Sequence, residues 1–229
     1  MSADSAQCII LVPATQIEPE CEAALRQLEQ RGYEVRRVSG YSQIDVARNE
    51  IAAKALDDGF DETFWIDADI RFSPDDVDRI RSHDLPLCCG IYPKKGLRQL
   101  AMKFLPDTER ISFGTNGGLM EIMYAATGFL HVRRQVYDDI QQQLNLPTCD
   151  AFQQSFVPYF LPMTREYESG HWYLGEDFAF CERARQCGYR IMADTSVRLW
   201  HVGRYAYGWE DAGSSPERYS DYLFRLEGQ

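Results

Sequence analysis

The sequence predicts an α/β fold: a mixed, mainly parallel sheet flanked by helices, with a smaller antiparallel part in its second half. Over about the first 95 of the 229 residues, short apolar runs alternate with amphipathic stretches. That alternation is typical of parallel strands joined by helices. After residue 96 the apolar runs are shorter and glycines interrupt them, which favours antiparallel strands.

The elements of the first half follow from short apolar runs and from apolar residues that recur on one helical face. Strands are predicted over 8–16, 34–40, 62–69 and 85–93. Helices are predicted over 18–33, 42–59 and 73–82. The last of these helices begins with Ser73 as the N-cap and Pro74 at the first helical position, two residue types that favour a helix start.

The second half is predicted to contain short strands within 97–106 and 110–134, helices over 133–144 and 176–189, and a final strand pair over 190–203. Residues 145–174 are rich in Pro, Phe and Tyr without clear periodicity, so we expect a loop-rich insertion there. Repeats and linkers are not evident, so we expect one domain over 1–229.

Composition excludes several classes of protein. The net charge of −11 argues against binding of a nucleic-acid backbone, which needs clustered positive charge. The sequence has no apolar run near the ~20 residues of a membrane span and no hydrophobic leader. Seven cysteines without paired spacing indicate reduced thiols. We therefore expect a cytoplasmic protein.

Asp67 and Asp69 directly follow the apolar run "TFWI". In an extended segment their side chains would point the same way, and two close carboxylates repel unless a cation or proton lies between them. Ligands of parallel sheets bind at the carboxyl ends of strands, and Mg²⁺ or Mn²⁺ would suit such a site. The alternative is that both residues cap the turn before the helix at 73–82. His201, after "VRLW", is a plausible further Mn²⁺ ligand or a packed histidine.

Glu176 and Asp177 follow Gly175 at the start of a predicted helix. The two carboxylates could simply complement the helix dipole. The aromatic residues Trp172 and Tyr173, just before them, favour instead a wall on which a sugar or base could stack. A carboxylate beside such a wall suits a general base.

The order of these motifs resembles the GT-A superfamily of nucleotide-sugar glycosyltransferases, particularly the family-2-like enzymes, over about residues 8–203. The stretches that carry the resemblance are "PAT", "DVARNEIAAKAL", "FWIDADIRFSPDDV", "CCGIYPKK", "ATGFLHVRRQVYDDI", "GEDFAFCERARQCGYRI" and "VRLWHVG". The resemblance implies a metal-dependent, hexosyltransferase-like enzyme that moves a sugar from a UDP- or GDP-sugar to an acceptor hydroxyl. It leaves the acceptor, the stereochemistry and the oligomeric state open.

The resemblance also implies roles for single residues. Asp69 would bind Mn²⁺ or Mg²⁺ together with His201, with Asp67 near the ribose or the water shell of the metal. Asp177 would be the base of an inverting enzyme, with Glu176 near one of the sugars. The first half, about 8–95, would bind the nucleotide, about 96–203 would hold the acceptor and catalytic residues, and 204–229 would form a tail.

Further residues are placed by the same resemblance. Arg48 would contact the diphosphate or the sugar. The loop residues Pro13, Ala14 and Thr15 would lie at the nucleotide base. Gly128 would bring backbone close to the acceptor. The aromatic residues Trp172 and Tyr173 are the other expected acceptor contacts.

Three other classes compete with this interpretation. A nucleotidyltransferase would favour a glycine-rich, basic loop after the first strand, whereas "VPATQIEPE" is acidic and has no glycine. A phosphohydrolase would favour a small hydroxyl residue two positions after Asp69, where this chain has Arg71. A catalytically silent nucleotide-sugar-binding protein would be separated by titration with Mn²⁺ and nucleotides.

Overall fold

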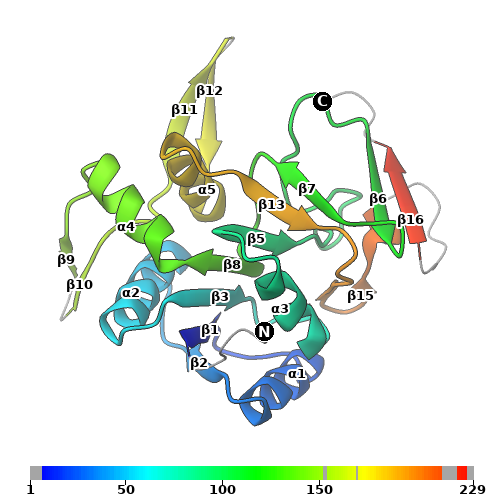
Figure 1. The fold of residues 1–229 in the computed structure, drawn as a ribbon, viewed down its shortest axis with the longest axis horizontal. Helices are drawn as coiled ribbons and strands as arrows, with labels where there is room; N and C mark the ends of the chain where they lie inside the picture. The colour runs from blue at the N-terminus through cyan, green and yellow to red at the C-terminus, as the bar shows by residue number, and fades with distance from the viewer. Residues whose placement is uncertain (1–6, 152–153, 169, 213–220, 226–229) are drawn as a thin grey trace.

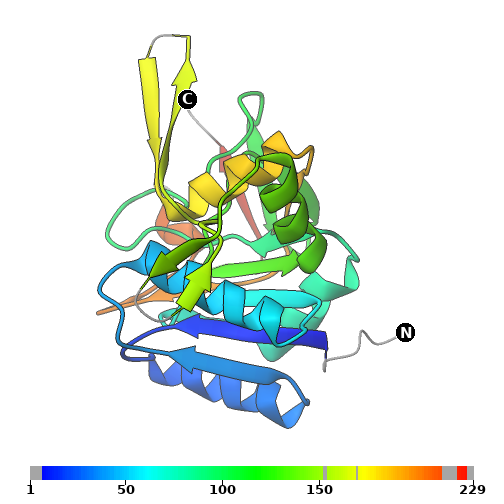
Figure 2. The same ribbon diagram turned by 90° about the vertical axis from the view of Figure 1, so that its left-hand side faces the viewer.

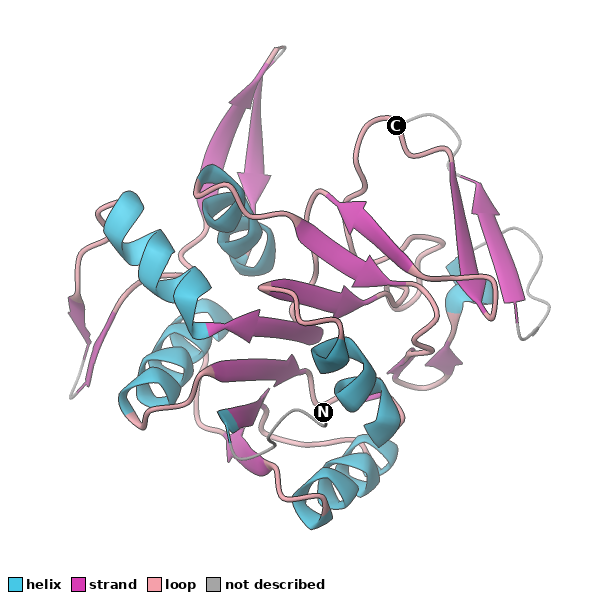
Figure 3. Ribbon diagram, in the orientation of Figure 1, coloured by secondary structure: helices cyan, strands magenta, loops and turns pink. Residues whose placement is uncertain are grey.

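The computed structural model describes residues 7–151, 154–168, 170–212 and 221–225. A seven-stranded sheet runs through its centre, with helices on both faces (Figures 1 and 3). In order across the sheet, the strands are β2 (Glu34–Val38), β1 (Cys8–Pro13), β3 (Glu62–Ile66), β8 (Phe129–Arg133), β5 (Leu87–Gly90), β13 (Ile191–Asp194) and β7 (Leu119–Ile122). Only β8 and β7 run against the other strands of this sheet. The predicted fold class is confirmed.

Two apolar layers hold the helices against the sheet. On one face, α2 (Ile44–Asp57), α4 (Arg134–Gln143) and α5 (Glu176–Gln186) pack against alternate strand residues such as Trp65 and Leu130. On the other face, α1 (Pro19–Gln30) and α3 (Pro74–Ser82) pack against the intervening residues, among them Phe64 and Phe129. Successive strand residues therefore serve opposite layers, so both faces of the sheet are buried.

The helix that begins after Ser73 forms as the sequence predicts. Pro74 occupies its first turn, and the Asp76 carboxylate accepts a hydrogen bond from the Ser73 backbone N–H at 2.9 Å. This arrangement satisfies an N–H group at the helix start that would otherwise lack a partner.

The strand predicted over 62–69 is shorter than expected. It ends at Ile66, and the Ile70 N–H donates to the carbonyl of Asp67 at 3.0 Å to close a turn. The chain then continues into β4 (Ile70–Arg71), which leaves the main sheet and pairs with β14 (Trp200–Val202). The two aspartates therefore lie on a turn at the carboxyl end of a buried strand.

The expectation that residues 145–174 form a loop-rich insertion needs correcting. The segment contains two hairpins, β9 (Cys149–Ala151) with β10 (Gln154–Phe156) and β11 (Met163–Tyr167) with β12 (Gly170–Leu174). Figure 2 shows the second hairpin projecting from the body of the molecule. The alternating pattern that marks a strand needs one buried face, and these short hairpins bury little of either.

Three other expectations differ from the structure. Residues 97–106 make only isolated bridges, between Pro93 and Leu100 and between Lys103 and Tyr124. The strands predicted as a pair over 190–203 join different sheets, β13 in the main sheet and β14 beside β15 (Ala206–Tyr207). Part of the expected tail forms η2 (Trp209–Ala212) and β16 (Asp221–Arg225), which pairs with β6 (Arg110–Gly114).

Within the described residues, every helix is too short or too polar to span a bilayer.

Candidate functional site

The candidate site lies at the edge of the sheet where β1, β3 and β5 end. The antiparallel strand β8 starts at this edge, because Phe129 pairs with Ile66, the last residue of β3. The loop after β1 is tied to the same place by a hydrogen bond from the Glu18 N–H to the carbonyl of Ala68, 2.9 Å long. Strand ends, a strand start and two loops thus converge around Asp67 and Asp69.

Arg48 on α2 is the buried cation of this site. Its side chain is only 3% exposed, its Nη2 donates to Asp67 Oδ1 at 2.8 Å, and its Nε lies 3.8 Å from Glu176 Oε1. Its guanidinium carbon lies 5.5 Å from the centre of the Trp65 ring. Burial alone would lower the pKa of Arg48, but the charges of Asp67, Glu176 and Asp177 raise it above its usual value. Arg48 therefore stays charged and compensates three carboxylates.

Two nitrogen atoms of the Arg48 guanidinium group lack a hydrogen-bond partner among the described residues. Nε and Nη1 are buried and make no hydrogen bond within the described part of the chain. A buried donor without a partner is rare in proteins because it loses its hydrogen bonds to water. Nε faces the Glu176 carboxylate at 3.8 Å, and the predicted contact of Arg48 to a sugar-nucleotide donor stays a prediction.

Gly128 must be glycine for a local reason. A Cβ atom there would lie 2.3 Å from Tyr92 Oη and 2.8 Å from Asp67 Oδ2, well inside van der Waals contact. Its backbone N–H donates to Tyr92 Oη at 3.0 Å, and its carbonyl accepts from the Asp67 N–H at 3.0 Å. The close approach seen at Gly128 is thus to Tyr92 and Asp67, and its predicted nearness to an acceptor stays a prediction.

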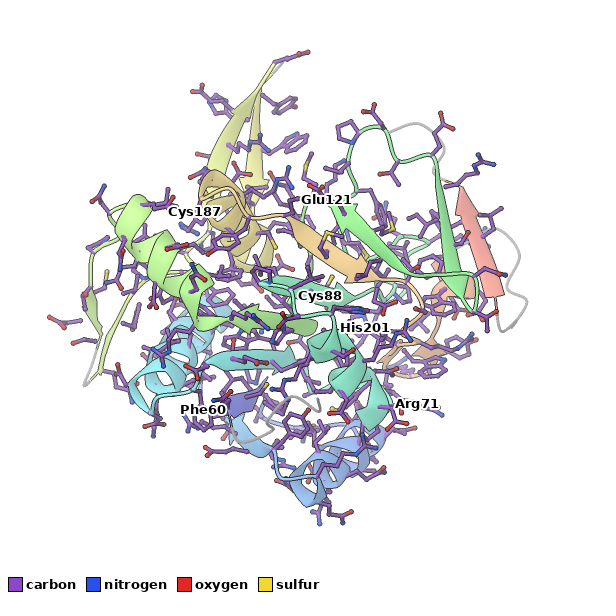
Figure 4. The ribbon with its side chains drawn as sticks, viewed as in Figure 1. Phe60, Arg71, Cys88, Glu121, Cys187 and His201 are labelled. Carbon is purple, nitrogen blue, oxygen red and sulfur yellow. The ribbon has the colours of Figure 1, made fainter. Side chains whose placement is uncertain are left out.

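Asp69 and His201 are brought together by the pairing of β4 with β14. The Val202 N–H donates to the carbonyl of Asp69 at 2.7 Å, and His201 Nε2 lies 3.5 Å from Asp69 Oδ2. The same carboxylate oxygen lies 2.5 Å from Lys95 Nζ. Burial alone would raise the pKa of Asp69, but its contacts with His201 and Lys95 lower it to about 2. Figure 4 labels His201, which pairs with Ile70, and Arg71, which pairs with the neighbouring Trp200.

The chemistry of this pair fits a divalent cation. His201 Nδ1 is 2.9 Å from the carbonyl of Pro93, which can only accept, so Nδ1 carries a proton. In a neutral imidazole, Nε2 then presents a lone pair toward Asp69, with its orientation fixed by a backbone carbonyl, as is usual for metal-binding histidines. No cluster of three or more His, Cys, Asp or Glu ligands occurs among the described residues. Oxygen atoms of a bound diphosphate and water would have to complete the shell.

Asp67 has a different environment from Asp69. Its Oδ1 accepts from Arg48, whereas Asp69 faces Lys95 and His201. Each aspartate of the Asp-x-Asp motif therefore has its own cation, which explains how the fold tolerates two neighbouring carboxylates. The predicted roles of Asp67 at the ribose and at the metal stay predictions.

Glu176 and Asp177 form the first turn of α5. Asp177 Oδ1 accepts from the Phe178 N–H at 2.7 Å. Burial, with the nearby charge of Glu176 as the next contribution, raises the pKa of Asp177 to about 6. A carboxyl group with such a pKa is ionised at neutral pH and still basic enough to accept a proton.

The aromatic wall expected from Trp172 and Tyr173 is not formed by the two together. They are neighbours in β12, so their side chains point to opposite sides of the hairpin. The Trp172 ring packs on Tyr167 with centroids 5.0 Å apart, and Lys103 Nζ lies 5.5 Å from its centre. Tyr173 is 75% exposed. The predicted acceptor contact of Trp172 and Tyr173 stays a prediction.

The loop after β1 holds the residues predicted to meet the nucleotide base. Ala14 is fixed by a hydrogen bond from its N–H to the carbonyl of Val38 at 2.8 Å, while Thr15 is exposed. Pro13 ends β1. The loop therefore borders the turn at Asp67–Asp69, and contact with a base stays a prediction.

Sequence reasoning missed Tyr92 and did not place Lys95. Tyr92 is buried, its hydroxyl accepts from Gly128, and its ring packs edge-to-face on His201 with centroids 5.3 Å apart. Both residues lie in "GIYPKK", directly after β5. Their position at the carboxyl end of a strand was the signal that could have revealed them.

The comparisons with known proteins bear on the fold of this chain. Neither the protein-family models nor the curated proteins give a match. The crystal structure of A197 from STIV is similar over 97% of this chain and 95% of that chain, with a TM-score of 0.56 and 18% identity. At this identity the likeness shows the fold alone.

Two further solved structures are more distant. GalNAc-T7 with UDP, GalNAc and Mn²⁺ aligns with 87% of this chain and 38% of that chain, with a TM-score of 0.42 and 12% identity. S. aureus TarS 1-349 aligns over 90% and 61%, with a TM-score of 0.37 and 12% identity. These scores are too low to support an argument. The strand order is that of an α/β protein with a mixed, mainly parallel central sheet.

Gly128→Ala should destabilise the protein by about 1–3 kcal/mol, because the new methyl group displaces Tyr92 or Asp67. Urea unfolding of the variant and the parent measures this difference. Gly118→Ala is the matched control, since a Cβ there meets no atom within 4 Å. Equal stability of Gly128→Ala and the parent would contradict the packing described here.

Arg48→Met should destabilise the protein by about 3 kcal/mol, because it leaves a partly buried carboxylate without its cation. Adding Asp67→Asn should restore part of that loss, since the uncompensated charge is then removed. Arg26→Met, which breaks an exposed pair with Glu22, should cost less than about 1 kcal/mol. Simple additivity of Arg48→Met and Asp67→Asn would show that the two side chains are not coupled.

Proposed function

We propose that this protein is a glycosyltransferase that moves a sugar from a UDP- or GDP-sugar to an acceptor hydroxyl, with Mn²⁺ or Mg²⁺ as cofactor. The observation that supports it most strongly is the convergence of Asp69 with His201 and of Asp177 with Arg48 at one sheet edge. A cation site and a base of raised pKa beside each other are what sugar transfer from a nucleoside diphosphate needs.

Asp69 and His201 would hold the cation. When bound, a divalent cation neutralises the charge that develops on the diphosphate as it leaves. The Pro93 carbonyl keeps His201 Nε2 directed at Asp69, so the two protein donors are oriented before any ligand arrives. Phosphate oxygens can then complete the coordination, which makes nucleotide binding depend on the metal.

Asp177 would take the proton of the acceptor hydroxyl as it attacks the sugar. Its raised pKa comes from burial and from Glu176, while the hydrogen bond from the Phe178 N–H and the charge of Arg48 limit the rise. Glu176, 3.8 Å from Arg48 Nε, would lie near the sugar rather than act as the base. The two guanidinium nitrogens of Arg48 that make no hydrogen bond among the described residues would contact an anionic or hydroxyl group of the UDP- or GDP-sugar.

Asp69→Asn should abolish Mn²⁺-dependent binding of UDP or GDP while the melting temperature stays near that of the parent. Calorimetric titration of each nucleotide with and without Mn²⁺ measures this effect. His201→Ala should weaken metal binding as well. Asp75→Asn on α3, an exposed acid paired with Arg31, is the control and should bind normally. Unchanged nucleotide affinity in Asp69→Asn would remove Asp69 from the cation site.

Asp177→Asn should lower turnover about 10²–10⁴-fold, because a positioned base contributes that much. Donor affinity should hardly change, since the proton comes from the acceptor. The measurement is turnover, or hydrolysis of whichever UDP- or GDP-sugar most raises the melting temperature, beside donor affinity by calorimetry.

The pH profile gives a second test of Asp177. A base works only when ionised, so turnover of the parent should fall as the pH drops through about 6, the pKa of this group. Asp177→Asn should lose that dependence. Glu176→Gln should keep a dependence shifted to lower pH, because the charge of Glu176 no longer raises the pKa of Asp177. Equal losses of turnover and donor affinity in Asp177→Asn would make it a donor-site residue instead.

A further inference from the structure

Lys95 occupies the position where positive charge is needed at Asp69. Its Nζ lies 2.5 Å from Asp69 Oδ2, closer than His201 Nε2 at 3.5 Å from the same oxygen. The Asp69 carboxylate therefore meets the ammonium group of Lys95 more closely than the imidazole ring of His201. An opposite charge at this distance favours the ionised carboxylate.

The segment that carries Lys95 is built so that the ammonium can leave. Lys94 to Gln99 form an exposed loop, closed at its base by the Pro93–Leu100 bridge and by a hydrogen bond from the Lys94 N–H to the Gln99 carbonyl at 2.8 Å. The Lys95 side chain is 36% exposed. Partly exposed ion pairs of this kind contribute only about 1 kcal/mol, so a stronger cation can replace this one.

The same loop base also orients the histidine. The Pro93 carbonyl accepts a hydrogen bond from His201 Nδ1, and Lys95, two residues later, contacts Asp69. One short stretch of chain therefore contacts both members of the Asp69–His201 pair. The bridge at Pro93 anchors the orienting carbonyl, whereas Lys95 lies beyond it in the exposed part. The ammonium can therefore move away without disturbing the ring that would bind a metal.

We propose that Lys95 competes with the divalent cation for Asp69: it is the resident counter-ion of this carboxylate and is displaced when the metal binds. The proposal rests on the cation site proposed above. An ammonium and a divalent cation on one carboxylate oxygen would repel each other strongly at this distance. Metal binding to the protein without nucleotide is therefore weakened by the energy needed to break the Lys95–Asp69 pair.

The test is Lys95→Met, which keeps most of the length of the side chain and removes its charge. Mn²⁺ alone is titrated into the full chain, without nucleotide, and free Mn²⁺ is followed by electron paramagnetic resonance. Affinity should rise by up to about fivefold over the parent, the factor that corresponds to loss of an opposing pair of about 1 kcal/mol. Lys95→Arg should stay near the parent, because the positive charge is retained.

Lys94→Met is the matched control. Its ammonium lies 3.5 Å from Gln99 Oε1 and is exposed on the same loop. It should leave Mn²⁺ affinity unchanged, which separates the position of Lys95 from the general loss of one positive charge. Melting temperatures of the variants without metal show that each is folded.

Two results would overturn the proposal: unchanged or weaker Mn²⁺ binding in Lys95→Met, or an equal gain in Lys94→Met. A parallel titration with UDP and GDP tests the proposed function separately from the competition between Lys95 and the metal. If nucleotides bind only with Mn²⁺ but Lys95→Met gains no Mn²⁺ affinity, the competition is wrong and the function stands. If no nucleotide binds to any variant while Lys95→Met gains Mn²⁺ affinity, the competition stands and the function is wrong.

Discussion

The buried guanidinium of Arg48 is the interaction on which the rest of the candidate site depends. A charge removed from water costs several kcal/mol unless partners compensate it. Arg48 finds them in the turn after β3 and in the first turn of α5, with Asp67 at 2.8 Å and Glu176 at 3.8 Å. One side chain from α2 thereby holds acidic residues from two distant segments at one edge of the sheet, and it keeps the raised pKa of Asp177 from rising further.

The sheet supplies a second constraint, because antiparallel pairing brings remote segments into register. Pairing of β3 with β8 places Gly128 against Asp67, where no larger residue fits. Pairing of β4 with β14 places His201 beside Asp69. The acidic turn is therefore shaped from two sides by strands that arrive late in the chain, and its geometry depends on the whole sheet having formed.

Charge compensation divides the site into two parts with different chemistry. Around Arg48, a permanently charged and buried cation keeps carboxylates in place, which suits a positioned base. Around Asp69, the protein cation is Lys95, half-exposed on a loop and therefore replaceable. The fixed cation and the exchangeable cation serve neighbouring aspartates of one turn. Proton transfer is proposed at the first part and metal and diphosphate binding at the second.

The sequence by itself determined the α/β class, the helices and strands of the first half, the Ser73 helix start and the acidic pair at a strand end. These features follow from periodicity and capping, which involve neighbouring residues only. It did not determine the hairpins within 145–174, whose faces bury too little to leave a pattern, and it wrongly joined Trp172 and Tyr173 in one wall. The partners that define the site, Tyr92, Lys95 and Arg48 with its carboxylates, were decided by tertiary structure. Their contacts join segments far apart in the chain, so no local pattern records which cation neutralises which acid.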